Sequence, residues 1–366
     1  MKEFVNQPNN TTSVKSKQEE KESRIPDYTI QIYFSGHGSS EDIAGATNTR
    51  QSSPEKFKRK GLADLFKKAD IYVPELYGWT ESALRQLQDL SYGRITPEQV
   101  LTEISSHIKS HIADVIERNN FDMEREDPMY SFKKSELEMI YQSYKPIIIF
   151  DIPEGHPKSG ILRGDQYTRP TGEISQLDTF EKTLSFIRES LKKTANSHNE
   201  REDYMLSQIN PKLEEVFKQR PDLRNKSDLQ VLMFLGALHT RVAHTLKQYG
   251  VKIKSHNSRS PQIFGFNNEA HRRLAFGMEV NNELAAQVLL EELCLEVLGG
   301  IILNLTKDHN EVTAFVRKIV NRFTYDEIKE LYEIGMPGAI VKFLSYLNEK
   351  NINPPTNHSD LMSFIS

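Results

Sequence analysis

The sequence predicts an α/β fold in which a mainly parallel sheet is flanked by helices and followed by a helical C-terminal part. Short apolar runs typical of strands occur at residues 28–35, 70–74, 146–151 and 229–235. Segments with helical periodicity separate these runs, which favours parallel strands joined by helical crossovers. Beyond about residue 260 the strand pattern vanishes and only helical patterns remain.

The chain divides into three predicted parts. Its 366 residues exceed the usual size of one domain, so a large core with an added region is expected. Residues 1–26 are polar and lack apolar periodicity, which predicts a disordered N-terminal segment. We expect the α/β core at 27–258 and the helical region at 259–366.

The first half of the predicted core begins as a β-α-β unit. Strand 28–35 is followed by a helix at Pro54–Lys68, with Ser53 as N-cap and Pro54 at the first helical position, and then by strand 70–74. Further helices are predicted before strand 146–151, at 81–90, 97–119 and 134–143.

The second half of the chain is mostly helical in pattern. Two amphipathic helices, Phe180–Ala195 and Glu200–Lys218, precede strand 229–235 and a helix at about 240–249. The C-terminal helices are predicted at 282–305, 308–322, 325–334 and 336–349, with Asp308 and Thr324 as N-caps.

Composition narrows the class of protein. The net charge of −4 and the mixed distribution of signs argue against nucleic-acid binding. Cys294 is the single cysteine, so an internal disulfide is excluded and a reducing, cytoplasmic location is expected. The N-terminus has no apolar signal-peptide core. The apolar stretch 284–305 contains three glutamates, so we predict no membrane span.

Three polar side chains follow predicted strands. His37 lies in a glycine-rich turn after the first strand, Glu75 ends the second, and His239 follows Gly236 at the exit of a late strand. Because ligands bind at the carboxyl ends of parallel strands, these three side chains are expected to share one crevice. Taken singly, each has a plainer interpretation: a histidine in a flexible loop, an acid in a surface loop, and a histidine that caps or packs against a helix.

A helical segment adds a charged group. Arg201 and Met205 lie four residues apart, so Met205 can pack inward while Arg201 presents a fixed positive charge beside Glu202. A solvated helix with internal ion pairs is the alternative interpretation. Trp79, close to Glu75, is a candidate wall for a substrate or simply a packed aromatic residue.

In this order, the elements resemble the superfamily that groups TraB-like proteins, TIKI metalloproteases, ChaN-like haem-binding proteins and erythromycin esterases. Gly236 and His239 match its Gly-x-x-His motif, and Arg201 with Met205 matches its Arg-acid-x-x-Met motif, in which Glu202 is the acid. The likeness spans residues 28 to about 250. The first motif departs from the usual pattern, since Phe34 stands where many members have glycine, and its His-Gly-Ser-Ser-Glu stretch is closer to erythromycin esterases.

The resemblance implies a hydrolase, metal-dependent in several branches of the superfamily, that acts on an ester or amide bond of a small molecule or peptide. His37, Glu75 and His239 would hold a divalent ion such as Mn, Zn or Co and activate a water molecule. Arg201 would stabilise the oxyanion, and Trp79 and Glu202 would contact the substrate.

A metal-free site with His37 or Glu75 as base is the near alternative. A second alternative is a non-catalytic protein that binds haem or another small molecule, or a signalling or toxin-associated protein. The sequence does not determine the oligomeric state.

Overall fold

The computed structural model of the chain confirms the α/β prediction. It describes residues 28–35, 61–76, 78–102, 128–158, 179–257, 264–306 and 309–365. The predicted N-terminal segment, His37, the start of the predicted helix at 54–68 and most of the one at 97–119 lie outside these ranges. Across the described part, no helix combines the length and the apolar character needed to cross a lipid bilayer.

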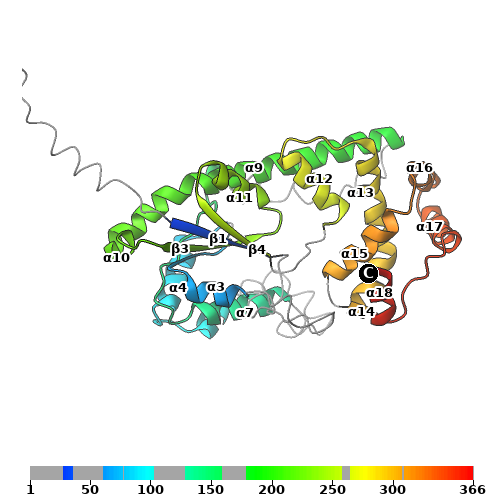
Figure 1. Cartoon of the computed structure of the whole chain (residues 1–366). Coiled ribbons are helices and arrows are strands. Elements are labelled where there is room, and N and C mark those ends of the chain that lie inside the picture. Colours follow the sequence, from blue (N-terminus) through cyan, green and yellow to red (C-terminus); the bar gives the residue numbers. More distant parts are fainter. Residues whose placement is uncertain are drawn as a thin grey trace, which may run out of the picture.

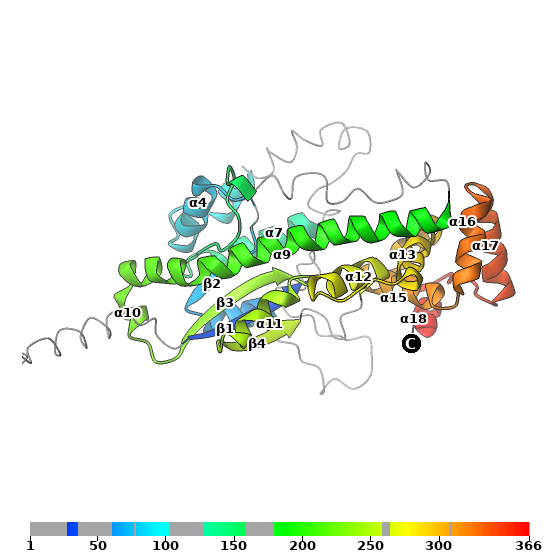
Figure 2. The same ribbon diagram turned by 90° about the horizontal axis from the view of Figure 1, so that it is seen from above.

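The described strands form one sheet in which every pairing is parallel (Figures 1 and 2). Their order is β2-β3-β1-β4, and they are β1 Tyr28–Ser35, β2 Ile71–Val73, β3 Leu229–Gly236 and β4 Lys252–Asn257. In the β1–β3 pair, Ser35 lies opposite Gly236. These two strands therefore end level with each other, and β2, which carries Glu75 two residues beyond its end, is the next strand on the far side of β3.

Helices cover both faces of the sheet (Figure 1). One face, which includes Ile30, Ile32, Val231 and Met233, packs against α9, Phe180–Gln219, and α11, Thr240–Gln248. The opposite face, which includes Tyr33, Tyr72, Leu232 and Phe234, packs against three helices: α3 Leu62–Lys68, α4 Glu81–Ser91 and α7 Pro128–Ile140. The alternation of inward side chains along β1 and β3 puts apolar groups on both faces, as expected for a buried parallel sheet.

Helix α9, Phe180–Gln219, is one continuous helix of 40 residues, whereas the sequence predicted two. Its first half packs Phe180, Leu184 and Ile187 into the core of the C-terminal helices. Its second half packs Ile209 and Leu213 onto the sheet. The helix therefore joins the two hydrophobic cores, and the helical part of the molecule includes residues that precede 259 (Figure 2).

The C-terminal part is helical, as predicted. After the short α10, Pro221–Arg224, and the sheet, its elements are α12 Phe266–Ala275, α13 Asn282–Cys294, a π-helical turn Leu295–Gly299, α14 Gly300–Thr306, α15 His309–Val320, α16 Tyr325–Ile334, α17 Gly338–Glu349 and α18 His358–Ile365. Thr324 caps α16 in a reciprocal capping box with Glu327, which confirms that N-cap. Cys294 is fully buried, as expected for a small apolar side chain. Asp308 lies outside the described ranges.

The strands of the structure differ from the predicted ones in two places. Residues 146–151 do not form a strand, because they meet β2 only through an isolated bridge between Tyr72 and Ile147. Strand β4 was not predicted from the sequence. Its half-exposed Lys-Ile-Lys-Ser-His-Asn sequence carries little apolar signal, since it lies at the edge of the sheet.

Candidate functional site

Charged side chains from four chain segments meet at the carboxyl ends of β2 and β3. They are Glu75 after β2, Asp151 from the loop beyond residue 150, Arg201 and Glu202 from α9, and His239 at the start of α11. Asp151, Arg201, Glu202 and His239 are all buried. We call these five residues the charge cluster.

Arg201 lies at the centre of the charge cluster. Its Nε donates to Asp151 Oδ1 at 2.9 Å, and its Nη2 donates both to Asp151 Oδ2 and, at 2.8 Å, to Glu75 Oε1. Met205, one turn further along α9, is fully buried in the sheet core and fixes this face of the helix. Although burial opposes it, the two carboxylates raise the pKa of the Arg201 guanidinium, so Arg201 is a permanent cation.

His239 lies between two carboxylates. Its Nδ1 is 3.0 Å from Glu202 Oε1, and its Nε2 is 3.2 Å from Glu75 Oε1. Burial alone would lower the pKa of His239, but Glu75 and Glu202 outweigh burial and raise it to about 9. The ring is therefore an imidazolium at neutral pH and donates a hydrogen bond to each acid.

The second contact of His239 Nε2 gives the ring a defined neutral form. Nε2 is also 3.3 Å from Arg201 Nη1. A neutral ring with its proton on Nδ1 would keep the bond to Glu202 and accept from Arg201. When Nε2 is protonated, it can no longer accept from Arg201 and instead donates to Glu75. The proton at Nε2 can thus come and go while Glu202 holds the ring in place.

Backbone geometry fixes Glu75 and His239. The Gly236 N–H at the end of β3 donates to Glu75 Oε2. The His239 N–H donates to the Gly236 carbonyl at 3.0 Å, which closes a tight turn before α11. His239 occupies the N-cap position of α11, yet its side chain makes no capping bond. The capping interpretation is therefore wrong for its ring, which is directed to the acids.

Four of the predicted site residues thus come together. Glu75, Arg201 and His239 lie within hydrogen-bonding distance of one another, and Glu202 joins them. The solvated-helix interpretation is wrong for Arg201 and Glu202, which are 8% and 2% exposed. His37 lies outside the described residues. Strand β1 ends at Ser35, which lies opposite Gly236.

Trp79 supports the cluster through the backbone of Asp151. Its indole is buried and donates to the Asp151 carbonyl at 2.8 Å. Asp151 Oδ1 also accepts the Ile152 N–H at 2.9 Å. These bonds hold the carboxylate against Arg201, while a substrate contact of Trp79 stays a prediction.

Sequence reasoning missed Asp151, although a signal was present. Asp151 follows the apolar run Ile147–Phe150 in the same way that Glu75 follows β2. Asp151 ends the predicted strand 146–151 and was assigned no role in the site. Its role as the bidentate partner of Arg201 depends on the fold of the 151–156 loop.

Two further histidines lie against the charge cluster. The His198 ring from α9 stacks on His239, with centroids 5.7 Å apart, and His271 from α12 meets His198 edge-on at 4.5 Å. Burial, reinforced by His271 and His239, lowers the pKa of His198 to about 3. Burial also lowers the pKa of His271. Both rings are therefore neutral beside a charged one, and α12 brings the C-terminal part up to the site.

His244 lies away from this centre. It is exposed on α11, packs edge-on against Phe276 and lies 3.0 Å from the Gln248 amide. A residue five positions beyond His239 projects from a different side of the helix.

The donor atoms of the described residues do not fit a divalent metal ion. Glu75 uses both oxygens for Arg201, His239 and Gly236, and both nitrogens of His239 face carboxylates. The guanidinium of Arg201 already supplies the positive charge that these carboxylates need. Within the described ranges, no group of three His, Cys, Asp or Glu side chains is arranged to hold a metal. The Mn, Zn or Co assignment, which also involves His37, stays a prediction.

Comparisons of this chain with protein-family models, with curated proteins and with solved structures find no match. The class of the molecule therefore follows from its own geometry: an α/β protein whose parallel sheet ends in a buried charge cluster.

Proposed function

We propose that the chain is a hydrolase that cleaves an ester or amide bond by acid–base catalysis at the charge cluster. The observation that carries this proposal is His239, a buried imidazolium held between Glu202 and Glu75 beside the guanidinium of Arg201. A paired acid and base with a fixed cation is the set of groups that attack on a carbonyl requires.

Each member has a definite role in the proposed reaction. Glu75 takes a proton from the water that attacks the acyl carbon, and His239 Nε2 gives its proton to the leaving oxygen or nitrogen as that bond breaks. Arg201 stabilises the negative charge on the carbonyl oxygen of the tetrahedral intermediate. Glu202 keeps the imidazole in orientation through Nδ1.

The direct contact between Glu75 and His239 completes the cycle. After the leaving group departs, Glu75 holds the proton from water and His239 Nε2 has lost its own. The two atoms are 3.2 Å apart, so this proton passes from Glu75 to His239 and restores the starting state. The proposed steps need no metal ion.

Access is proposed along the Glu75 and Arg201 side. Their side chains are 10% and 9% exposed, whereas those of Glu202 and His239 are 3% exposed. A carbonyl group that approaches this side would meet the guanidinium and the carboxylate first. A small ester or a peptide bond is the substrate class that suits these groups.

The test is hydrolysis of a panel of aryl esters and chromogenic peptide amides by the full chain. We expect turnover by the wild type and a loss of about 100-fold or more in kcat/KM for Glu75→Gln and for His239→Ala. His244→Ala, on the same helix but exposed, is the control and should keep the wild-type rate. Equal rates in wild type and His239→Ala would refute the proposal.

A non-catalytic ligand-binding protein is the second candidate. It is favoured by the internal pairing of the charge cluster, in which each of the five side chains has a partner of opposite charge. This candidate, with haem as the ligand to test first, predicts no turnover by the wild type and a change in the absorbance of added hemin that His239→Ala removes.

A further inference from the structure

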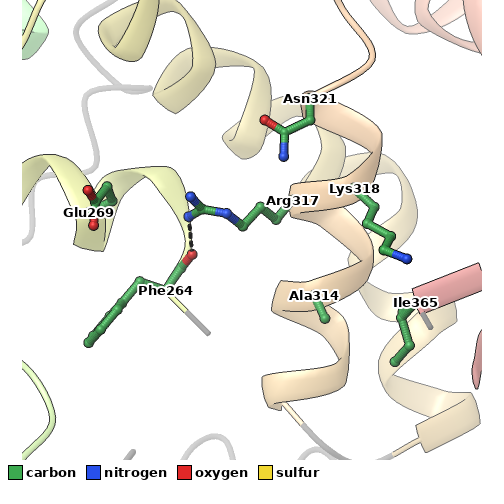
Figure 3. Close-up of a pocket in the computed structure, with 7 residues that line it drawn as sticks. All are labelled: Phe264, Glu269, Ala314, Arg317, Lys318, Asn321 and Ile365. Carbon is green, nitrogen blue, oxygen red and sulfur yellow. Dashed lines mark hydrogen bonds between the residues drawn. The ribbon is translucent and has the colours of Figure 1, made fainter. Parts of the chain in front are cut away.

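A second candidate site lies in the C-terminal part, where a cavity of about 350 Å³ opens between α12, α15 and α18 (Figure 3). Helix α15 contributes Ala314, Arg317 and Lys318, and Asn321 follows directly after its end. The remaining lining residues are Phe264 and Glu269, on the α12 side, and Ile365 of α18. A cavity of this volume is in the range that holds small organic molecules.

Positive charge dominates this cavity. Arg317 and Lys318 are its lining cations, and Glu269 is its acid. The Glu269 carboxylate is already paired, because Arg272 and Arg273 each donate to it at 3.0 Å. Although burial opposes it, these two arginines hold the pKa of Glu269 below its ordinary value. The cations around the cavity therefore outnumber their acid partner, and the local field favours an anion.

The nearby acid Glu291 interacts electrostatically with Arg317 and so reduces this excess of positive charge, but it does not reverse it. Its two oxygens accept the N–H groups of Phe266 and Asn267, each at 2.8 Å, and so cap the start of α12. The carboxylate is 5% exposed and is committed to the helix terminus.

The two lining cations are held in place by backbone carbonyls. Arg317 Nη1 donates to the Phe264 carbonyl at 2.6 Å, and its guanidinium lies 4.8 Å from the centre of the Phe266 ring. Lys318 Nζ donates to the Phe364 carbonyl at 3.0 Å. A guanidinium carries five N–H donors and an ammonium three, so each cation keeps donors for a ligand beyond these bonds. Figure 3 shows the Arg317 side chain reaching across from α15 toward Phe264.

Helix electrostatics alone do not explain this arrangement. Basic residues in the last turn of α15 offset the partial negative charge at that helix end. That effect requires no cavity, and it does not account for apolar walls from three different elements beside the cations.

We propose that this cavity binds a small organic anion, with a carboxylate or phosphate group and an apolar body. The anionic group would meet Arg317 on the side of α15 that faces Phe264, with the exposed amide of Asn321 at the rim. Lys318, whose side chain points away from Arg317 in Figure 3, would add positive charge to the cavity wall. The apolar body would lie against Phe264 and Ile365. This site is independent of the proposed hydrolysis, since none of its lining residues belongs to the charge cluster.

The test is titration calorimetry of the full chain with phenyl phosphate at low ionic strength. We expect saturable one-to-one binding that weakens as salt is added. Arg317→Gln should weaken binding by about tenfold or more, because it removes a charge-assisted contact. Lys318→Gln should weaken it by a smaller factor, because it removes positive charge from the cavity wall. Arg317→Lys keeps the charge and should fall between Arg317→Gln and wild type. Lys342→Gln, which alters a lysine on α17 paired with Glu330, is the control and should bind as wild type.

Further probes define the chemical class. Benzoate should bind, inorganic phosphate should bind more weakly because it lacks an apolar body, and neutral benzyl alcohol should give no saturable heat. The proposal is overturned if neither phenyl phosphate nor benzoate binds, if benzyl alcohol binds as well as the anions do, or if both glutamine variants, shown to be folded by circular dichroism, retain wild-type affinity. Lys318→Gln removes only one backbone contact, so it decides the matter if Arg317→Gln fails to fold.

Discussion

The imidazolium of His239 should make the stability of the protein fall in the alkaline range. Its pKa rises from an ordinary 6.5 to about 9 in the folded chain, chiefly because Glu75 and Glu202 flank the buried ring. A group whose pKa is higher in the folded state stabilises that state fully below its unfolded pKa. This contribution is then lost as the pH rises through the folded pKa, here between about 6.5 and 9.

The magnitude follows from the two pKa values. At about 1.4 kcal/mol per pH unit, the difference between 6.5 and about 9 corresponds to about 3 kcal/mol of the free energy of unfolding. Other groups titrate over the same range, so the useful quantity is the difference between wild type and His239→Gln. We expect that difference to become about 3 kcal/mol less favourable to the wild type between about pH 6 and pH 10.

The assay is urea unfolding followed by circular dichroism at several pH values. His244→Gln serves as the matched control, because His244 is an exposed histidine on the same helix, and it should follow the wild type. Glu202→Gln should move the loss to lower pH, because one of the two acids that raise the pKa is gone. A free-energy difference between wild type and His239→Gln that stays constant to within about 0.5 kcal/mol across the range would refute the reasoning.

Three further predictions follow from the same geometry. Arg201→Met should lower the free energy of unfolding by about 3–5 kcal/mol, because it leaves Asp151 buried without its cation and Glu75 with His239 alone. Arg220→Met, which breaks an exposed pair with Asp222, should cost less than about 1 kcal/mol in the same urea titration. Burial lowers the pKa of His198 to about 3, so the neutral ring stabilises the fold above pH 6.5 and this contribution is lost as the pH falls toward 3. The melting temperature of His198→Phe should therefore depend less on pH in this range than that of the wild type. Parallel melting-temperature curves for the two proteins would contradict the prediction. Burial raises the pKa of Cys294 to about 12, so an aromatic disulfide reagent should modify it only after unfolding, and rapid modification of the native protein would count against its buried position.

Several elements could be predicted because their signals are local. Strand β1 alternates apolar residues with Thr29 and Gln31 before Ser35, β3 is a mainly apolar run that ends in Gly236, and α16 begins with a complete capping box. The joining of Glu75, Arg201 and His239 was predictable in outline, since acids and histidines beyond parallel strands fall at one edge of the sheet.

The division of α9 into two helices was wrong for a physical reason. The helix buries its first half in one core and its second half in another, and its apolar stripe is interrupted between Ala195 and Met205. The interruption contains His198, Arg201 and Glu202, which are polar because they build the charge cluster and its histidine stack. A pattern that resembles a break between helices is therefore the part of one helix that faces the site.

The sequence by itself determined the α/β class, the helical character of the C-terminal part and the chain positions of most of the charged groups at the strand ends, because periodicity and strand exits are properties of neighbouring residues. Only the tertiary structure decided that Asp151 forms a bidentate ion pair with Arg201, that His239 is charged between two acids, and that His271 from α12 packs against His198. These outcomes depend on burial and on distances between segments that lie far apart in the sequence. His239, for example, contacts one acid 37 residues away and another 164 residues away, and no local pattern predicts such contacts.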